Sequence, residues 1–372
     1  MASSSPTTTR DSKKIIIHDF GQTPTKSLLT DLEGHLPFSL PVLRRIQFAL
    51  NFPGGCTANT HILHACYDDE RGHFVAAYVD VSRFPETQCW FYCTLEDLDY
   101  QIGVEEEGCD EFILAVLKTI KSFDFTGGEK QEKAVDEKNE EKRGQVDEGK
   151  RIQDAWQRGE ECVLIGSLHE AVRQRMLRKG IKMSKTLNVE DELEWEFCGK
   201  WLFREEDLSK VSSSDGVIVG RNGMTMRWDK VRREDVALIL SRTSIKRQEA
   251  TLLLLPSTVI RLEDGTPVAW GFMGLDGTLM TLHVEEPYRG QGLAKAVASK
   301  LMRDHIKDYG DDGWGVADVF VSNYQSQGVC KSIGGKLCWT LSCRGLSRPL
   351  MKRADQNMFV NRAIVDLSSL AD

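Results

Sequence analysis

The last third of the chain alternates short apolar runs of strand type with a run of helical period. Residues 279–284 are apolar and β-favouring, and Pro287 closes the run. Beyond it, Leu293, Val297 and Leu301 recur at the spacing of one helix face. A strand at 270–272 is expected to form a hairpin with the run at 279–284. With a further strand expected at 316–321, a helix at 326–333 and a strand at 336–341, the order is β-β-α-β-α-β. This order predicts an α/β fold with a mixed central sheet flanked by helices.

The chain before residue 263 carries runs of the same kinds. Its apolar, β-favouring runs predict strands at 15–17, His61–Tyr67, 74–81, Cys89–Cys93, 162–165 and 195–203. Its helical periods predict helices at 36–51, 108–123, 168–178 and 229–241. Two further short apolar runs lie at 252–255 and 259–262. Strands and helices therefore alternate along both halves.

One internal segment departs from this pattern. Residues 126–151 alternate Glu, Asp, Lys and Arg and contain no aromatic residue. Such a segment has little apolar surface to bury, which favours a disordered, solvated insertion. A single exposed charged helix is the alternative.

The length of 372 residues suits two domains. We expect a flexible lead at 1–25, a first domain at 26–215 that holds the charged insertion, a second domain at 216–350 and a tail at 351–372. A polar Ser-rich stretch at 212–216 marks the expected boundary.

Composition narrows the function classes. The net charge of -8 argues against a nucleic-acid partner, because no basic excess is present to neutralise phosphates. No apolar run reaches the ~18 residues of a membrane span, and the start lacks the apolar core of a secretory signal. The ten cysteines form no C-x-x-C pair, so we expect reduced thiols, no metal and a cytoplasmic protein, with mitochondria as the second option.

The strongest local signal is a glycine-rich turn between the strand at 279–284 and its helix. Gly290 and Gly292 let the backbone turn sharply, and the free N–H groups of the helix start form an anion site suited to a phosphate. The turn has no Gly-Lys-Ser/Thr, so it is not a P-loop. It also has one glycine too few for a dinucleotide fingerprint.

The residues around this turn carry a family resemblance. Arg289-Gly290-Gln291-Gly292-Leu293-Ala294 is similar to the R/Q-x-x-G-x-G/A loop of the GNAT acyltransferases. The flanking sequence resembles the second domain of the glycine N-acyltransferase-like family, in particular its fungal members. The matching stretches are Gly265-Thr266-Pro267-Val268-Ala269-Trp270, Met273, Asp276-Gly277 and Pro287-Tyr288-Arg289. The resemblance covers about 230–345 and implies two tandem GNAT-like halves, of which the first is degenerate.

The resemblance implies an acyl-CoA site, with acetyl-CoA or another acyl-CoA as co-substrate. The backbone N–H groups expected to hold the CoA pyrophosphate belong to Arg289, Gly290, Gln291, Gly292, Leu293 and Ala294. The backbone expected to pair with the pantetheine arm belongs to Leu282, His283 and Val284. Asn323, at the end of the strand at 316–321, matches the Asn that contacts the cofactor near its pantetheine. A long ligand with an anionic end and amides along its arm suits a helix start continued by an open strand edge.

The proton-transfer groups are less clearly marked. The position where many GNAT enzymes place a tyrosine acid is Cys330, and the position of the glycine acyltransferases' glutamate base is Thr278. The remaining candidates are Asp276, His283 and the neighbouring carboxylates Glu285 and Glu286. Strand alternation places His283 on the face opposite Thr278, which argues against His283. For Cys330 the alternative is a buried structural thiol.

We therefore expect an enzyme that transfers an acyl group, in the first instance acetyl, from CoA directly to a small amine or amino acid. An acyl-CoA-binding protein without turnover is the alternative, because the tyrosine and the glutamate are missing. Acylation of a protein or peptide amine is a third reading. We expect a monomer or homodimer with no membrane partner.

Overall fold

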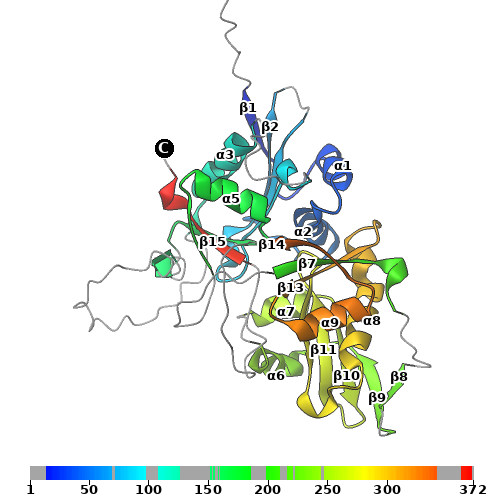
Figure 1. The fold of residues 1–372 in the computed structure, drawn as a ribbon. Helices are drawn as coiled ribbons and strands as arrows, with labels where there is room; N and C mark the ends of the chain where they lie inside the picture. Colours follow the sequence, from blue (N-terminus) through cyan, green and yellow to red (C-terminus); the bar gives the residue numbers. More distant parts are fainter. Residues whose placement is uncertain are drawn as a thin grey trace, which may run out of the picture.

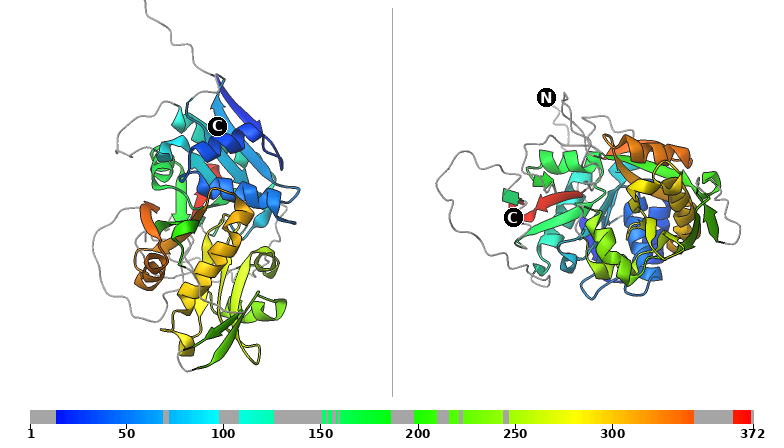
Figure 2. Two further views of the ribbon diagram at one scale, coloured as in Figure 1. Left: turned by 90° about the vertical axis from the view of Figure 1, so that its right-hand side faces the viewer. Right: turned by 90° about the horizontal axis from the view of Figure 1, so that it is seen from below.

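The computed structural model describes residues 14–68, 72–97, 108–125, 151–152, 154–155, 158, 160–185, 198–209, 216–220, 223–243, 247–341 and 362–370. The two halves of the chain form two lobes, with the N-terminal half in blue to cyan and the C-terminal half in yellow to orange (Figures 1 and 2). Most of the charged insertion expected at 126–151, and the polar boundary up to 215, lie outside the described residues.

The N-terminal lobe is built on one seven-stranded sheet in the order β1-β2-β3-β4-β5-β15-β6. Its strands are β1 Ile15–Asp19, β2 His61–Tyr67, β3 Val75–Val79, β4 Cys89–Cys93, β5 Cys162–Gly166, β6 Lys182–Lys185 and β15 Arg362–Asp366. Its helices are α1 Lys26–Gly34, α2 Leu40–Asn51, α3 Cys109–Lys121 and α5 Glu170–Arg178.

Helices cover both faces of this sheet, which explains its apolar strands. Leu63 and Phe91 pack with residues of α3 and α5, whereas Ile62 and Trp90 pack on the opposite side with residues of α1 and α2. A strand buried on both faces has no exposed positions and loses the apolar–polar alternation. β4 is accordingly buried at all five positions.

The C-terminal lobe contains two smaller sheets, in the orders β12-β11-β10-β9-β8 and β13-β7-β14. Their strands are β7 Cys198–Arg204, β8 Val217–Val219, β9 Thr225–Asp229, β10 Ser257–Leu262, β11 Pro267–Met273, β12 Leu279–Val284, β13 Trp314–Phe320 and β14 Lys336–Leu341. The helices are α6 Val236–Ser241, α7 Glu249–Leu254, α8 Leu293–Tyr309 and α9 Tyr324–Ser332. The long helix α8 packs on β10, β11 and β12.

The two lobes exchange strands, so the expected boundary at 215/216 does not separate two structural units. β7 precedes that boundary, yet it lies between β13 and β14 of the C-terminal lobe. In return, β15 crosses back and lies between β5 and β6 of the N-terminal sheet (Figure 1). The expected tail at 351–372 thus holds a sheet strand. The expected lead at 1–25 likewise includes β1, which pairs with β2.

Three expected elements differ in extent or kind. The helix expected at 36–51 begins at Leu40, with Pro41 in its first turn, where the missing N–H costs no hydrogen bond. The helix expected at 229–241 begins at Val236, because residues up to Asp229 form β9. The apolar run 252–255 falls mainly within α7; four consecutive apolar residues do not reveal their period.

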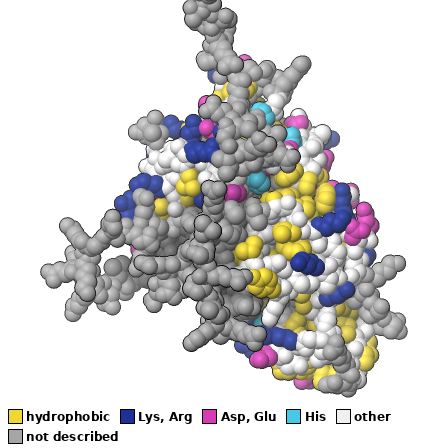
Figure 3. Space-filling view, viewed as in Figure 1, with side chains coloured by type: hydrophobic (Ala, Val, Ile, Leu, Met, Phe, Trp, Pro, Cys, Tyr) yellow, Lys and Arg dark blue, Asp and Glu magenta, His cyan; other side chains and the backbone are white. Residues whose placement is uncertain are grey.

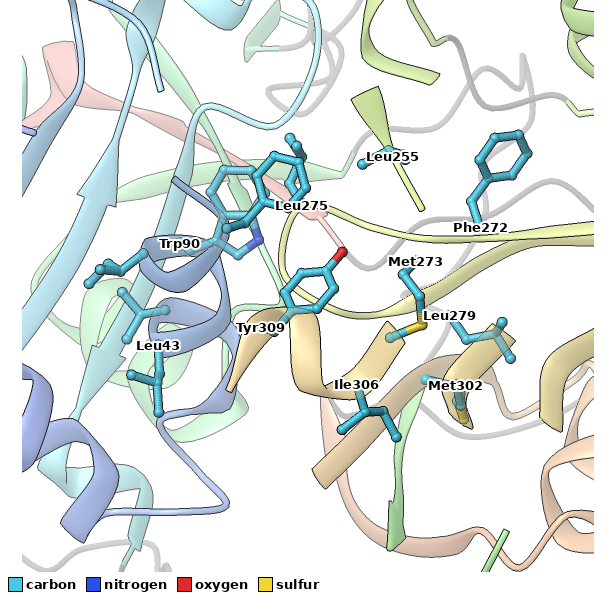
Figure 4. Packing of buried hydrophobic residues seen from close by; sticks show 14 of the residues in the cluster. Leu43, Trp90, Leu255, Phe272, Met273, Leu275, Leu279, Met302, Ile306 and Tyr309 are labelled. Atoms are coloured by element: carbon cyan, nitrogen blue, oxygen red, sulfur yellow. The ribbon is translucent and has the colours of Figure 1, made fainter. Parts of the chain in front are cut away.

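A shared core joins the lobes. Figure 4 shows Leu43 and Trp90 from the N-terminal half beside Leu275 and Tyr309 from the C-terminal half. The Tyr309 hydroxyl donates to the Gly274 carbonyl at 2.6 Å, and the buried Arg44 donates to the Asp312 carboxylate at 2.7 Å. On the face shown in Figure 3, the basic side chains lie in separate small groups.

Candidate active site

The two C-terminal sheets diverge where β12 and β13 run side by side. Among the residues that the structure describes, the single bridge between these parallel strands is Thr278 with Val316. Beyond that pair the strands separate, and a cavity of about 210 Å³ lies between them. Residues of β12, β13 and α9 line it, and so do Trp90 and Ser167 of the N-terminal lobe. The two strands thus diverge at this point, and both lobes contribute residues to the cavity.

A β-bulge in β12 determines which side chains face this cavity. Trp270 pairs with His283 and Phe272 with Met280, so one residue of β11 opposes two residues of β12. Thr281, in the bulge, has a φ of 52°, in the left-handed region. The extra residue reverses the side-chain alternation. Thr278, Met280 and His283 therefore all line the cavity, and the strand-parity argument against His283 was wrong.

The glycine-rich turn has the geometry of an anion site. Gly290 and Gly292 have φ values of 74° and 81°, and α8 begins directly after Gly292. The first α8 residue to donate to a helical carbonyl is Ala296, which bonds to Gly292 at 3.0 Å. No acidic residue occupies the first turn of α8, and a side-chain carbon at Gly290 or Gly292 would meet no atom within 4 Å in the part of the chain described. An anion can approach these backbone N–H groups freely.

The other residues expected to bind the cofactor surround the same place. Leu293 is buried and Leu282 and Val284 pack against its core cluster, which fixes β12 to the start of α8. Ala294 and Gln291 are partly buried at the turn. Arg289 is exposed, and its Nε donates to the Val284 carbonyl at 3.0 Å. The guanidinium is thereby held next to the turn, and one of the carbonyls expected to face pantetheine is engaged by it.

His283 is the candidate base with the most suitable surroundings. Its ring stacks on Trp270 at 4.7 Å between centroids, and its side chain is 10% exposed. Nε2 is buried without a hydrogen-bond partner in the described chain and lies 3.8 Å from Glu285 Oε1. Burial lowers the pKa of His283, so the imidazole is neutral near pH 7 and has a nitrogen able to accept a proton.

Asp276 and Asn323 line the cavity but have other partners. Asp276 Oδ2 accepts from Trp90 Nε1 at 2.9 Å, and Oδ1 accepts from the Thr278 N–H at 3.2 Å. Asn323 caps α9, because its Oδ1 accepts from the Ser326 N–H at 3.0 Å. Both side chains are thus held in place at the cavity wall.

Cys330 and Glu286 fit a catalytic role poorly. Cys330 lies on α9 and is 3% exposed, and burial raises the pKa of its thiol to about 12. Such a thiol gives up its proton less readily than an ordinary one, which favours the structural role. Glu286 lies in a short 3-10 turn, is exposed and is not among the residues that line the cavity. Glu285 pairs with Arg242 at 2.9 Å.

Several cavity residues were missed in the sequence. Asp318, on β13, forms an ion pair with the buried Lys200 of β7 at 2.6 Å and accepts from Ser167 Oγ at 2.7 Å. Arg247 and Glu86 line the end of the cavity next to the N-terminal lobe. The one local signal was Asp318, a lone carboxylate in an apolar strand. The others come from segments far apart in the sequence.

Comparison with known proteins supports an enzyme of the acyltransferase class. Residues 12–196 match the family described as the acyl-CoA N-acyltransferase verG N-terminal domain. The match covers 185 of the 372 residues, just under half of the chain, and supports the GNAT acyltransferase superfamily. The match falls on the half that the sequence reading treated as degenerate, and it agrees with the expected fold and with an enzyme of the acyltransferase class.

One of the solved structures compared has a similar overall fold. A Drosophila protein of 13% identity superposes with a TM-score of 0.51 over 88% of this chain and 97% of its own. A tandem GNAT protein from the clavulanic acid biosynthesis pathway, at 8% identity, covers 88% of this chain and 98% of its own with a TM-score of 0.45. The latter score is too low to carry an argument. A search of the curated proteins found no significant sequence match.

No helix of the described residues is long and apolar enough to cross a membrane. Those residues also contain no group of three or more His, Cys, Asp or Glu side chains placed to hold a metal.

Proposed function

We propose that this protein transfers an acyl group, in the first instance acetyl, from CoA to the amino group of a small acceptor. The observation that carries the proposal is the divergence of β12 from β13 after Thr278 and Val316, with the glycine-rich start of α8 at the far end of β12. This arrangement offers an anion site, an open strand edge and a cavity in one line, which suits a CoA thioester.

In this proposal the backbone from Arg289 to Ala294 binds the pyrophosphate, and β12 holds the pantetheine arm. The thioester then lies between β12 and β13, next to His283. The acceptor enters from the side of the cavity lined by Trp90 and Arg247. A cavity of about 210 Å³ favours a small acceptor over a protein side chain with its flanking backbone.

The reaction needs one proton acceptor. The neutral amine attacks the thioester carbonyl carbon, the C–N bond forms, and the C–S bond breaks as the electron pair leaves with sulfur. His283 Nε2 takes the proton that the amine loses, since this nitrogen is unpartnered and its ring is neutral. The CoA thiolate takes its proton from water, because the buried Cys330 thiol, with its pKa of about 12, is a poor donor.

The resemblance of residues 230–345 to glycine N-acyltransferases supports an amine of amino-acid size. We place the protein in the cytoplasm, where acyl-CoA is supplied, as a monomer or homodimer. The experiment that tests the function mixes the full chain with acetyl-CoA and a panel of small amines and measures free thiol. Amine-dependent release of thiol together with the N-acetylated product is expected.

Tight binding of acetyl-CoA without thiol release for any amine would instead support the acyl-CoA-binding protein without turnover. A panel of peptides with free amino groups, assayed in parallel, distinguishes the third reading. Faster turnover of peptides than of small amines would contradict the proposal.

A further inference from the structure

One cation of the cavity lacks a counter-group. Arg247 precedes α7 and lines the cavity where the two lobes meet. Its Nε is buried and has no hydrogen-bond partner among the described residues. A buried guanidinium with unmade hydrogen bonds costs free energy, so its position here calls for an explanation.

The nearest carboxylates bond to other groups. Glu86, which is 3% exposed, accepts from the Gln248 N–H at 3.0 Å and from Thr251 Oγ1 at 2.6 Å. Its Oε2 also pairs with Arg83 at 3.0 Å. Asp276 accepts from Trp90 and from the Thr278 N–H. Neither carboxylate bonds to Arg247, although both lie close enough to act on its charge.

The balance of charge leaves Arg247 without full compensation. Burial is the main influence and lowers the pKa of Arg247; Glu86 and Asp276 raise it, and Arg83 lowers it further. Because Glu86 already pairs with Arg83, the negative charge of Glu86 is largely neutralised. A further anionic group at the end of the cavity near the N-terminal lobe would therefore be stabilised by Arg247.

A second arginine of the cavity provides a contrast. Arg242 also lines the cavity, but its Nε donates to Glu285 Oε1 at 2.9 Å. Arg242 is thus provided with a carboxylate by the chain itself. Among the described residues, no carboxylate bonds to Arg247, which is on the side of the N-terminal lobe.

We propose that Arg247 binds a carboxylate of the acceptor, so that the acceptor is an amine that also carries a carboxylate. The planar guanidinium matches a carboxylate through two parallel N–H···O bonds, which makes it the best partner for this group. This inference rests on the proposed function for the direction of the acceptor, whose amine faces His283 while its carboxylate faces Arg247. Amines without an acidic group are then poor acceptors.

The test uses the full chain and matched acceptors, an amino acid and its primary amide, which are similar in size and differ in charge. The variants are Arg247→Met, which removes the charge at similar length, and Arg247→Lys, which keeps the charge without the planar fork. The control is Arg233→Met, which removes an exposed arginine. Arg233 pairs with Glu249 at the start of α7, the helix that Arg247 precedes. Thermal melts of each variant verify the fold.

We expect the wild type to prefer the amino acid, and Arg247→Met to lower the ratio of kcat/KM for acid over amide by about 30-fold, mainly through KM. Arg247→Lys restores part of the ratio, and Arg233→Met leaves it unchanged. A wild type that acetylates the amide as well as the acid overturns the inference. So does an Arg247→Met variant that loses both activities in the same proportion.

Calorimetric titration of the CoA-saturated protein with the amino acid gives a readout that needs no turnover. Binding that Arg247→Met abolishes, in a protein that acylates no amine, supports the carboxylate site and rejects the proposed transferase activity. Equal binding of acid and amide, or binding that is unaffected by Arg247→Met, rejects the carboxylate site even if acyl transfer is observed. If neither probe binds, the carboxylate site is rejected as well.

Discussion

The two lobes share a topology, but only one of them leaves its helix start open. α3 and α8 both begin after a glycine in the left-handed region, Gly108 with φ 88° and Gly292 with φ 81°. A side-chain carbon at Gly108 would clash with the ring of Tyr67, whereas one at Gly292 would meet no described atom within 4 Å. Asp110 and Glu111 occupy the first turn of α3. The N-terminal lobe thus fills with its own groups the place that α8 leaves for a ligand.

The two lobes also differ in how far their parallel strands stay paired. In the N-terminal lobe, β4 and β5 stay paired at Cys89 with Ile165 and at Trp90 with Gly166. The Gln88 side chain adds a bond to the Leu164 N–H at 3.0 Å. In the C-terminal lobe, β12 and β13 separate after one bridge. The difference teaches that the two lobes can keep similar strand pairings while the helix start and the parallel strand pair are closed in one lobe and open in the other.

The largest expected effect tests whether the lobes are separable at all. A chain that stops after residue 350 lacks β15, whose residues Ala363, Ile364 and Val365 are buried in the N-terminal sheet. Burial of the Ile364 and Val365 side chains contributes about 1.5–3 kcal/mol each, and the edges of β5 and β6 become exposed when β15 is missing. We expect loss of cooperative unfolding in thermal melts and of acyl-CoA binding. A control chain that stops after Leu370 keeps both.

If the shorter chain melts cooperatively at the same temperature as the full chain, the strand exchange does not hold the lobes together.

The second prediction concerns the proton acceptor in the open strand pair. His283→Gln keeps the size and polarity of the side chain but cannot take the amine proton, so kcat should fall about 100- to 1,000-fold. Because burial lowers the pKa of His283, the wild-type rate should fall on acidification only below about pH 6.5, as the imidazole becomes protonated. Steady-state rates from pH 5 to pH 9 measure both effects.

Asp276→Asn serves as the comparison, since it changes a carboxylate of the same cavity that Trp90 and Thr278 hold in place. An acid limb that persists in His283→Gln, or one that disappears in Asp276→Asn, assigns the base to another group.

The third prediction compares the two helix starts directly. Gly292→Asp places a carboxylate where the CoA pyrophosphate is expected, so the Kd for CoA should rise about 100-fold. Gly292→Asn, which has the same shape and tolerates the left-handed backbone, should weaken binding by about 10-fold or less. Glu111→Gln removes an exposed charge from the first turn of α3 and should leave the Kd unchanged. Equal Kd values for Gly292→Asp and Gly292→Asn would show that charge at this position has no role.

The smallest effect is expected at Cys330. Since its thiol is buried and its pKa is about 12, Cys330→Ala should change kcat by less than about threefold and lower the free energy of unfolding by about 1–2 kcal/mol. Activity assays and urea titrations on one preparation measure both. A tenfold loss of kcat with unchanged stability would restore Cys330 as the acid.

The sequence allowed the local parts of this picture to be predicted. The strand at 279–284, the turn at Gly290 and Gly292 and the helix after it depend on neighbouring residues, and the structure has them as β12 and α8. The strands β1 to β5 of the N-terminal sheet were predicted for the same reason, whereas β6 and β15 were not. Periodicity and glycine positions are enough where an element is defined by its own residues.

Long-range features were beyond such reasoning. The bulge that turns His283 toward the cavity arises from the pairing of β12 with β11, so strict alternation gave the wrong face. Arg247 lies near Glu86, 161 residues away in sequence, only because Gln248 and Thr251 bond to Glu86 of the N-terminal lobe. The exchange of β7 and β15 between the lobes could not be predicted either, because no local signal in a strand indicates which sheet it will join.

The exchange of strands bears on how such a chain can evolve. β7 is encoded with the first half of the protein, yet it is the central strand of the sheet that contains β13. A gene that lost its first half would therefore lose a strand from the half that holds the cofactor turn. Selection on the lobe that we propose to bind acyl-CoA would then also preserve the segment that carries β7.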